Sequence, residues 1–171
     1  MPLSAVVVYE DLETGKHAKR MCDFLVRNLG EDCRFVSQMW KFEMLAVPAF
    51  REMAAGDAAL ADLIFVSSHG LGDLPMDVKA WVELWLGTPT SAFALVALFD
   101  RPNENTNEVQ AVQDYLGTVA RRGGMEFFAQ PDVWPDSPVT TRRVVRNGLA
   151  ATDVAAVPTR NASVGHWGLN E

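Results

Sequence analysis

Five strand-like runs alternate with amphipathic segments over the first 130 residues, and this alternation limits the possible folds more than any other feature. The runs are rich in β-branched and aromatic residues and cover residues 5–9, 34–40, 63–66, 92–99 and 125–129. Between the third and fourth runs, apolar residues recur at helical spacing, as at Val78, Trp81, Val82 and Trp85. The pattern predicts an α/β fold in three layers, with a doubly wound, five-stranded parallel sheet between helices.

Four helices are expected to connect these strands. The first has an apolar stripe that begins at Ala18 and is closed by Gly30, and the second covers residues 47–60. The third begins near Met76, and the fourth carries apolar residues from Val109 to Val119. Since every crossover between parallel strands is expected to be right-handed, the helices should divide between the two faces of the sheet.

Composition and charge exclude several classes of protein. The chain has 171 residues, of which 49% are hydrophobic, and this is enough for one domain with a full core. A formal net charge of −7 argues against nucleic acid or an anionic membrane as the main partner, because phosphates would be repelled. The same charge suits solubility or a basic partner. Two cysteines, Cys22 and Cys33, are too few for a disulfide framework, and no zinc-like spacing occurs.

Long apolar runs and the two ends of the chain bear on membrane association and location. No apolar run reaches 18 residues, so no membrane span is expected. The N-terminus enters a strand without a basic segment, which predicts a cytoplasmic protein without a signal peptide. Beyond residue 130, prolines interrupt the chain around a short predicted helix over residues 141–149. This extension is expected to pack on the domain or on a partner, and the sequence leaves a homodimer open.

Three segments follow strands one, three and four and should meet at the same edge of the sheet. They cover residues 10–17, 67–75 and 100–107, and ligands of doubly wound folds bind at this edge. The second segment is the most informative, because it places Ser67, Ser68 and His69 before Gly70. Small hydroxylated residues and glycines let a ligand approach the backbone closely. A binding loop is one interpretation, and a tight turn is the other.

The second segment resembles a flavin-binding loop of the flavodoxin family. In that family a Thr-aromatic-Gly-Asp-Gly-Glu pattern follows strand three; here His69 takes the aromatic place, and Gly70, Gly72 and Asp73 fit. The order of elements over residues 4–130 is similar as well. The resemblance implies a flavodoxin-like domain over residues 1–130, followed by an irregular C-terminal extension over 131–171. It also implies an FMN-binding electron-transfer protein with a redox protein partner.

The resemblance assigns cofactor-binding roles in all three segments. Phosphate-binding residues are implied in the first segment, and residues that line the flavin ring in the others. The implied set is Thr14, Gly15, Lys16, Ser67, Ser68, His69, Gly70, Phe99 and Asp100. The pattern also departs from the family's: Leu12 and His17 replace hydroxylated residues, and no stacking aromatic follows Asp100 before Val109.

Negative charge in the first segment leads to a second hypothesis. Glu10, Asp11 and Glu13 lie where a phosphate would bind, and Lys16 offsets only part of their charge. Thr14 suits the capping of a helix N-terminus as well as a phosphate seat. The second hypothesis is therefore a flavodoxin-fold module without flavin, which acts as a ligand-binding or protein-interaction domain.

Two catalytic alternatives are weaker. The acidic pair Glu10 and Asp11 is typical of phosphoacceptor receiver domains, but Ser67 stands where their phosphorylated aspartate should follow strand three. A hydrolytic triad could be drawn from Ser67 or Ser68 with His69 and Asp100. No Gly-x-Ser-x-Gly turn is present, and neighbouring Ser and His side chains do not easily face each other. The sequence thus assigns no catalytic residue.

Overall fold

A computed structural model describes residues 2–30, 32–100 and 107–130 of the chain. The predicted C-terminal extension, with its short helix, and most of the third loop lie outside the described residues. The described residues therefore form the β/α part of the chain, which includes the first two loops and the start of the third.

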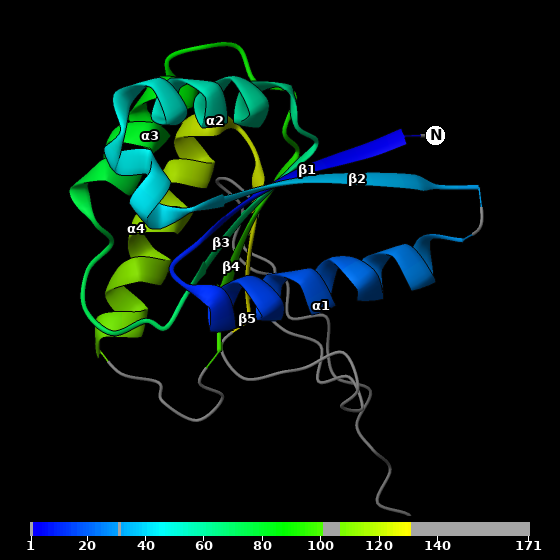
Figure 1. The fold of residues 1–171 in the computed structure, drawn as a ribbon, viewed down its shortest axis with the longest axis horizontal. Helices are drawn as coiled ribbons and strands as arrows, with labels where there is room; N and C mark the ends of the chain where they lie inside the picture. Colours follow the sequence, from blue (N-terminus) through cyan, green and yellow to red (C-terminus); the bar gives the residue numbers. More distant parts are fainter. Residues whose placement is uncertain (1, 31, 101–106, 131–171) are drawn as a thin grey trace, which may run out of the picture.

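The central sheet has five parallel strands in the order β2-β1-β3-β4-β5 (Figure 1). The strands are β1 (Pro2–Tyr9), β2 (Arg34–Lys41), β3 (Leu63–Ser68), β4 (Ala94–Phe99) and β5 (Glu126–Gln130). The prediction of a doubly wound, five-stranded parallel sheet is confirmed. Its topology is consistent with a flavodoxin-like α/β fold.

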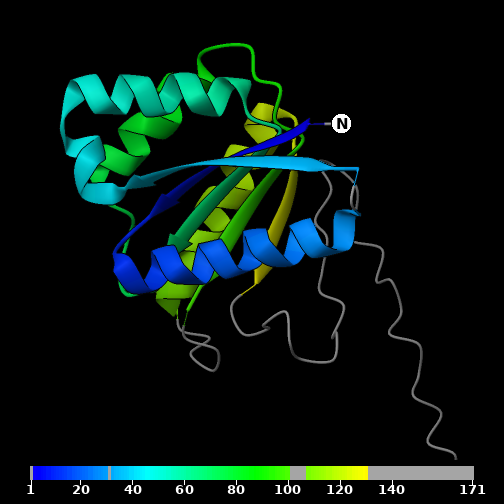
Figure 2. The same ribbon diagram turned by 45° about the vertical axis from the view of Figure 1, so that its right-hand side comes forward.

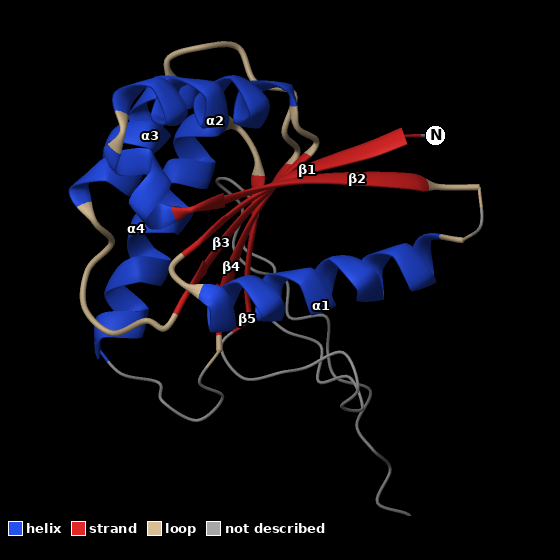
Figure 3. Cartoon of the chain, viewed as in Figure 1, coloured by secondary structure: helices blue, strands red, loops and turns tan. Residues whose placement is uncertain are grey.

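Helices cover the two faces of the sheet unequally (Figures 2 and 3). α1 (Leu12–Leu29) lies on one face, whereas α2 (Pro48–Leu60), α3 (Met76–Leu86) and α4 (Asn107–Gly123) lie on the other. Right-handed crossovers explain this division, because the step from β1 to β2 runs opposite to the later steps. A short 3₁₀ helix, η1 (Phe42–Ala46), joins β2 to α2 and was not predicted. None of the described helices combines the length and apolarity needed to cross a bilayer.

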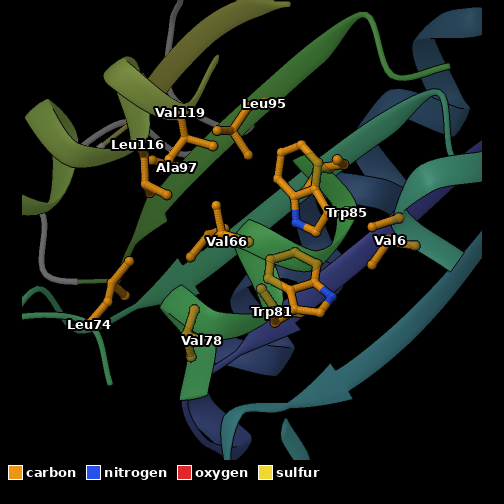
Figure 4. Close-up of a cluster of buried hydrophobic side chains, with 14 of the residues drawn as sticks. Val6, Val66, Leu74, Val78, Trp81, Trp85, Leu95, Ala97, Leu116 and Val119 are labelled. Carbon is orange, nitrogen blue, oxygen red and sulfur yellow. The ribbon is translucent and has the colours of Figure 1, made fainter. Parts of the chain in front are cut away.

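Two hydrophobic cores follow from this division. The larger core lies between the sheet and α2, α3 and α4, and it contains Trp81 and Trp85, whose ring centroids are 5.8 Å apart (Figure 4). The smaller core places Met21 and Cys22 of α1 near Phe65 of β3. The predicted apolar stripes of α3 and α4 are buried, so helical periodicity located the core correctly.

Two differences between the observed and the expected element boundaries affect the loops. α1 begins at Leu12, because Asp11 caps it, so the first predicted loop shrinks to Glu10 and Asp11. β3 continues through Ser68, two residues beyond its predicted end, and both of its serines are buried. The third strand was expected to end at Val66 because serine, which follows it, is not among the residues enriched in strands. In the structure, pairing with β1 and β4 extends the strand.

Candidate functional site at the carboxyl edge

Four polar residues meet where β1, β3 and β4 end, an edge that we call the carboxyl edge. Glu10 and Asp11 follow β1, His69 follows β3, and Asp100 follows β4. Because these strands are neighbours in a parallel sheet, their ends lie side by side. Residues far apart in the sequence are thereby brought into direct contact.

The imidazole of His69 bridges two carboxylates. Its Nδ1 lies 2.8 Å from both carboxylate oxygens of Asp100, and its Nε2 lies 2.6 Å from Oδ2 of Asp11. The backbone N–H of His69 donates to Oε2 of Glu10 at 2.9 Å. The side chains of His69 and Asp100 are 17% and 19% exposed, whereas that of Asp11 is 44% exposed. Asp11 is therefore the most accessible of the three groups.

The two carboxylates favour a charged imidazole. Burial of His69 opposes the charged form, but hydrogen bonds to Asp11 and Asp100, together with their negative charge, raise its pKa above the usual value. The hydrogen bond from His69 and the backbone N–H of Thr14 lower the pKa of Asp11 to about 2. The bridge is thus an ion triad, with one cation between two anions, at pH values below the raised pKa of His69.

The N-terminus of α1 is closed by its own residues. Asp11 is the N-cap: its Oδ1 accepts from the backbone N–H of Thr14 at 3.0 Å. The Thr14 hydroxyl in turn accepts from the N–H of Asp11 at 2.9 Å, which completes a capping box. Thr14 is fully buried, and Lys16 pairs with Glu13 on the helix surface. Of the two interpretations of Thr14, the structure shows helix capping, with Asp11 as the N-cap and Thr14 at the third helical position.

Packing against Tyr9 leaves no room for a side chain at Gly15. A Cβ at this position would lie 2.8 Å from Cδ2 of the Tyr9 ring, closer than real contacts allow. Gly15 itself is buried in the first turn of α1. Its match to the flavodoxin pattern therefore has an explanation within the fold.

The second loop depends on the conformational freedom of a glycine and on the core beneath it. Gly70 has φ of 72°, a conformation that disfavours side chains, and a Cβ there would lie 2.5 Å from Cγ2 of Val109. The same Cβ would approach the ring of Phe99 to 3.0 Å. Phe99 is 2% exposed, so it supports the loop from within the core. The hydroxyl of Ser68 accepts from the N–H of Gly70 at 3.3 Å.

The serine hydroxyls do not face His69. Ser67 is fully buried, and its hydroxyl donates to the carbonyl of Thr14 at 2.8 Å. The orienting contact of a hydrolytic triad is present between His69 and Asp100, but the other imidazole nitrogen faces Asp11. The site therefore holds a histidine-carboxylate pair for which neither Ser67 nor Ser68 serves as the nucleophile.

The residues at the first loop do not fit an FMN phosphate. A dianion at a helix N-terminus needs free N–H groups, yet the N–H of Thr14 is satisfied by the Asp11 carboxylate. The carboxylates of Glu10 and Asp11 add like charge at the same place. Lys16 is engaged with Glu13. A phosphate that took the N–H of Thr14 would first have to displace the carboxylate of Asp11.

Sequence reasoning considered Glu10 and Asp11 as charges unfavourable to phosphate and as the acidic pair of a receiver domain, and it included neither in the candidate site. The structure makes Asp11 both a helix cap and a partner of His69, and it makes Glu10 an acceptor for the His69 backbone. The spacing of Asp11 and Thr14 is that of a capping box and was a usable signal for the first role. No local pattern indicates the second role, because Asp11 and His69 are 58 residues apart.

Metal binding and known families give no further assignment. Among residues 2–30, 32–100 and 107–130, no group of three or more His, Cys, Asp or Glu side chains is arranged to hold a metal ion. A scan against models of known protein families gives no match for this sequence, and a comparison with curated proteins gives none either. The site is therefore interpreted from its own geometry.

Proposed function

We propose that this chain is a flavodoxin-like binding module that works without flavin and recognises a cationic group of a basic partner at its carboxyl edge. The observation that supports this most is the convergence of Glu10, Asp11 and Asp100 on the single residue His69. Fold alone does not decide function in this architecture. The residues at the edge are therefore the basis of the proposal.

The charge of the cluster favours a cation. Two carboxylates, of Asp11 and Asp100, flank the imidazole, and a third, of Glu10, accepts from the backbone N–H of His69, so the cluster stays negative even when His69 is protonated. The 44% exposed carboxylate of Asp11 has acceptor capacity toward solvent. Guanidinium groups form paired hydrogen bonds with such carboxylates. The net charge of −7 attracts a basic partner over a longer range.

The absorption spectrum of the purified protein, before and after addition of FMN, tests whether flavin is involved. We expect a colourless protein that leaves the fluorescence of added FMN unquenched, because the capping box engages Thr14 and adds a carboxylate at the N-terminus of α1. Visible bands of oxidised flavin in the purified protein, or quenching on addition of FMN, would contradict the proposal.

A titration with a fluorescent penta-arginine peptide tests the cationic specificity. Asp11→Asn keeps an N-cap residue of nearly equal quality but removes the charge, so binding should weaken while the fold remains. Asp23→Asn, on the exposed surface of α1 beside Lys19, removes the same charge elsewhere. Equal weakening by both substitutions would show only general attraction and would contradict recognition at the carboxyl edge.

FMN-dependent electron transfer is the second candidate, and the strand order favours it. The loop from Ser68 to Gly70 lies between the ends of β1 and β4, where doubly wound folds bind their ligands. In this case the capping box would open, and Thr14 and Lys16 would be released for the phosphate. The same spectrum separates the two candidates, since only the second predicts bound flavin.

A further inference from the structure

The outer side of β2 is the longest unpaired strand edge among the described strands. β2 stands at the end of the strand order and pairs only with β1. It has eight residues, whereas β5 at the opposite end of the sheet has five. Main-chain groups along such an edge are available to another strand. Residues 36–39, in the middle of β2, are all exposed.

Apolar side chains flank this edge and form what we call the β2 edge surface: Val36, Met39, Trp40 and Phe50. The exposed fractions are 44% for Val36, 37% for Met39 and 41% for Phe50. The rings of Trp40 and Phe50 lie 6.4 Å apart, which joins the strand to α2. Exposed apolar groups gathered beside an open strand edge are typical of an interaction surface.

Charges that commonly protect a strand edge stand only at the two ends of β2. Arg34 begins the strand and Lys41 ends it, whereas residues 35–40 carry no charge. Lys41 is moreover paired with Glu43 at 2.9 Å. The middle of the edge is therefore open to pairing.

We propose that β2 pairs in the antiparallel sense with β2 of a second copy of this chain. A two-fold axis perpendicular to the sheet would then pass between the Ser37 residues of the two copies, and the two sheets would form one continuous sheet. Rotation about such an axis leaves each side chain on the same face of the joined sheet. Paired residues of the two copies point to the same face, and side chains alternate along a strand, so their positions must differ by an even number. Arg34 and Lys41 are an odd number apart, so their like charges never meet.

The register centred on Ser37 is complementary in both polarity and charge. Phe35 faces Met39 of the second copy, on the side of α1. Arg34 faces Trp40 of the second copy, on the side of α2, where the indole N–H donates to Asp57 at 3.0 Å. The guanidinium of one copy thus approaches the aromatic ring and the carboxylate of the other. This complementarity distinguishes a second copy from an unrelated apolar partner.

Sedimentation equilibrium of the full chain tests the dimer. We expect a reversible dimer in the wild type and a dissociation constant raised at least about tenfold in Val36→Lys, since a charge enters the centre of the interface. Leu84→Lys is the matched control, because Leu84 is 42% exposed on α3, away from β2. A monomeric wild type at every concentration would overturn the proposal. So would a dimer that Val36→Lys leaves intact.

Cysteine crosslinking tests the register independently of stability. In a Cys33→Ser background, Ser37→Cys places two thiols across the axis at a Cα separation of roughly 4.5–5.5 Å, which suits a disulfide. Gln38→Cys places them about two residues out of register and beyond easy reach. Rapid oxidative dimerisation of Ser37→Cys alone supports the pairing. Preferential crosslinking of Gln38→Cys, or of neither variant, would overturn it.

Discussion

The first and second loops of the carboxyl edge contain similar residue types, yet the structure uses them differently. The first has Thr14 and Gly15, and both are buried within the first turn of α1, where their polar groups are satisfied by the cap. The second has Ser68 and Gly70, which hold the chain so that His69 projects between two carboxylates. In both loops the fold itself uses the hydroxyl, so a hydroxyl near a glycine does not by itself indicate a ligand site.

Gly70→Ala should have the largest effect on this comparison. The new Cβ meets Val109 at 2.5 Å and requires φ of 72°, so the backbone and the packing are strained together. We expect a loss of about 2–4 kcal/mol in the free energy of unfolding. Gly72→Ala isolates the backbone part, because Gly72 has φ of 82° with no atom near its Cβ position. Equal losses in urea denaturation of the two variants would show that packing beneath the second loop contributes nothing.

Gly15→Ala tests whether packing excludes a side chain at position 15. The Cβ would meet the Tyr9 ring at 2.8 Å. Overpacking of this kind costs about 1–3 kcal/mol, against a helical gain of about 1 kcal/mol. Gly56→Ala, in α2 with nothing near its Cβ position, has only the gain and should stabilise the protein. Thermal unfolding should therefore shift in opposite directions for the two variants, and a shared upward shift would contradict the role assigned to Gly15.

Asp11→Ala should remove both functions of the first loop at once. Loss of the N-cap costs about 1 kcal/mol, and His69 loses the acceptor at its Nε2. Asp11→Asn restores the cap but not the negative charge. We expect urea denaturation to show a larger loss of stability in Asp11→Ala, and NMR titration to show a lower His69 pKa in both variants. An unchanged His69 pKa in Asp11→Asn would contradict the ion triad.

The smallest effect concerns pH. Since the folded state raises the pKa of His69, its contribution to stability is complete below the ordinary histidine pKa and is lost as the pH rises through the raised value. Asp11 behaves in the opposite sense: its contribution is present above its ordinary value and is lost as the pH falls toward about 2. Stability measured by denaturation should decline in the wild type as the pH rises from the ordinary histidine pKa through the raised value, and the decline over this range should disappear in His69→Gln. A decline that persists in His69→Gln would assign it to other groups.

The sequence by itself determined the layers, the sheet and the position of the loops. Strand-like runs, helical spacing and right-handed crossovers are local or general rules, and they placed β1 through β5 and the buried stripes of α3 and α4 correctly. They also placed the first two loops and Asp100 at one edge. Boundaries failed where tertiary pairing or a cap extended an element, as at Ser68 and Leu12.

Only the tertiary structure decided which polar groups at that edge are available. His69 contacts Asp11 and Asp100, which are 58 and 31 residues away, and Ser67 bonds to a carbonyl 53 residues away. No spacing rule connects such positions, because their separation depends on the order of strands in the sheet rather than on the chain. Hydrogen-bonding capacity is a property of each residue type, but whether it remains free depends on the neighbours that folding supplies.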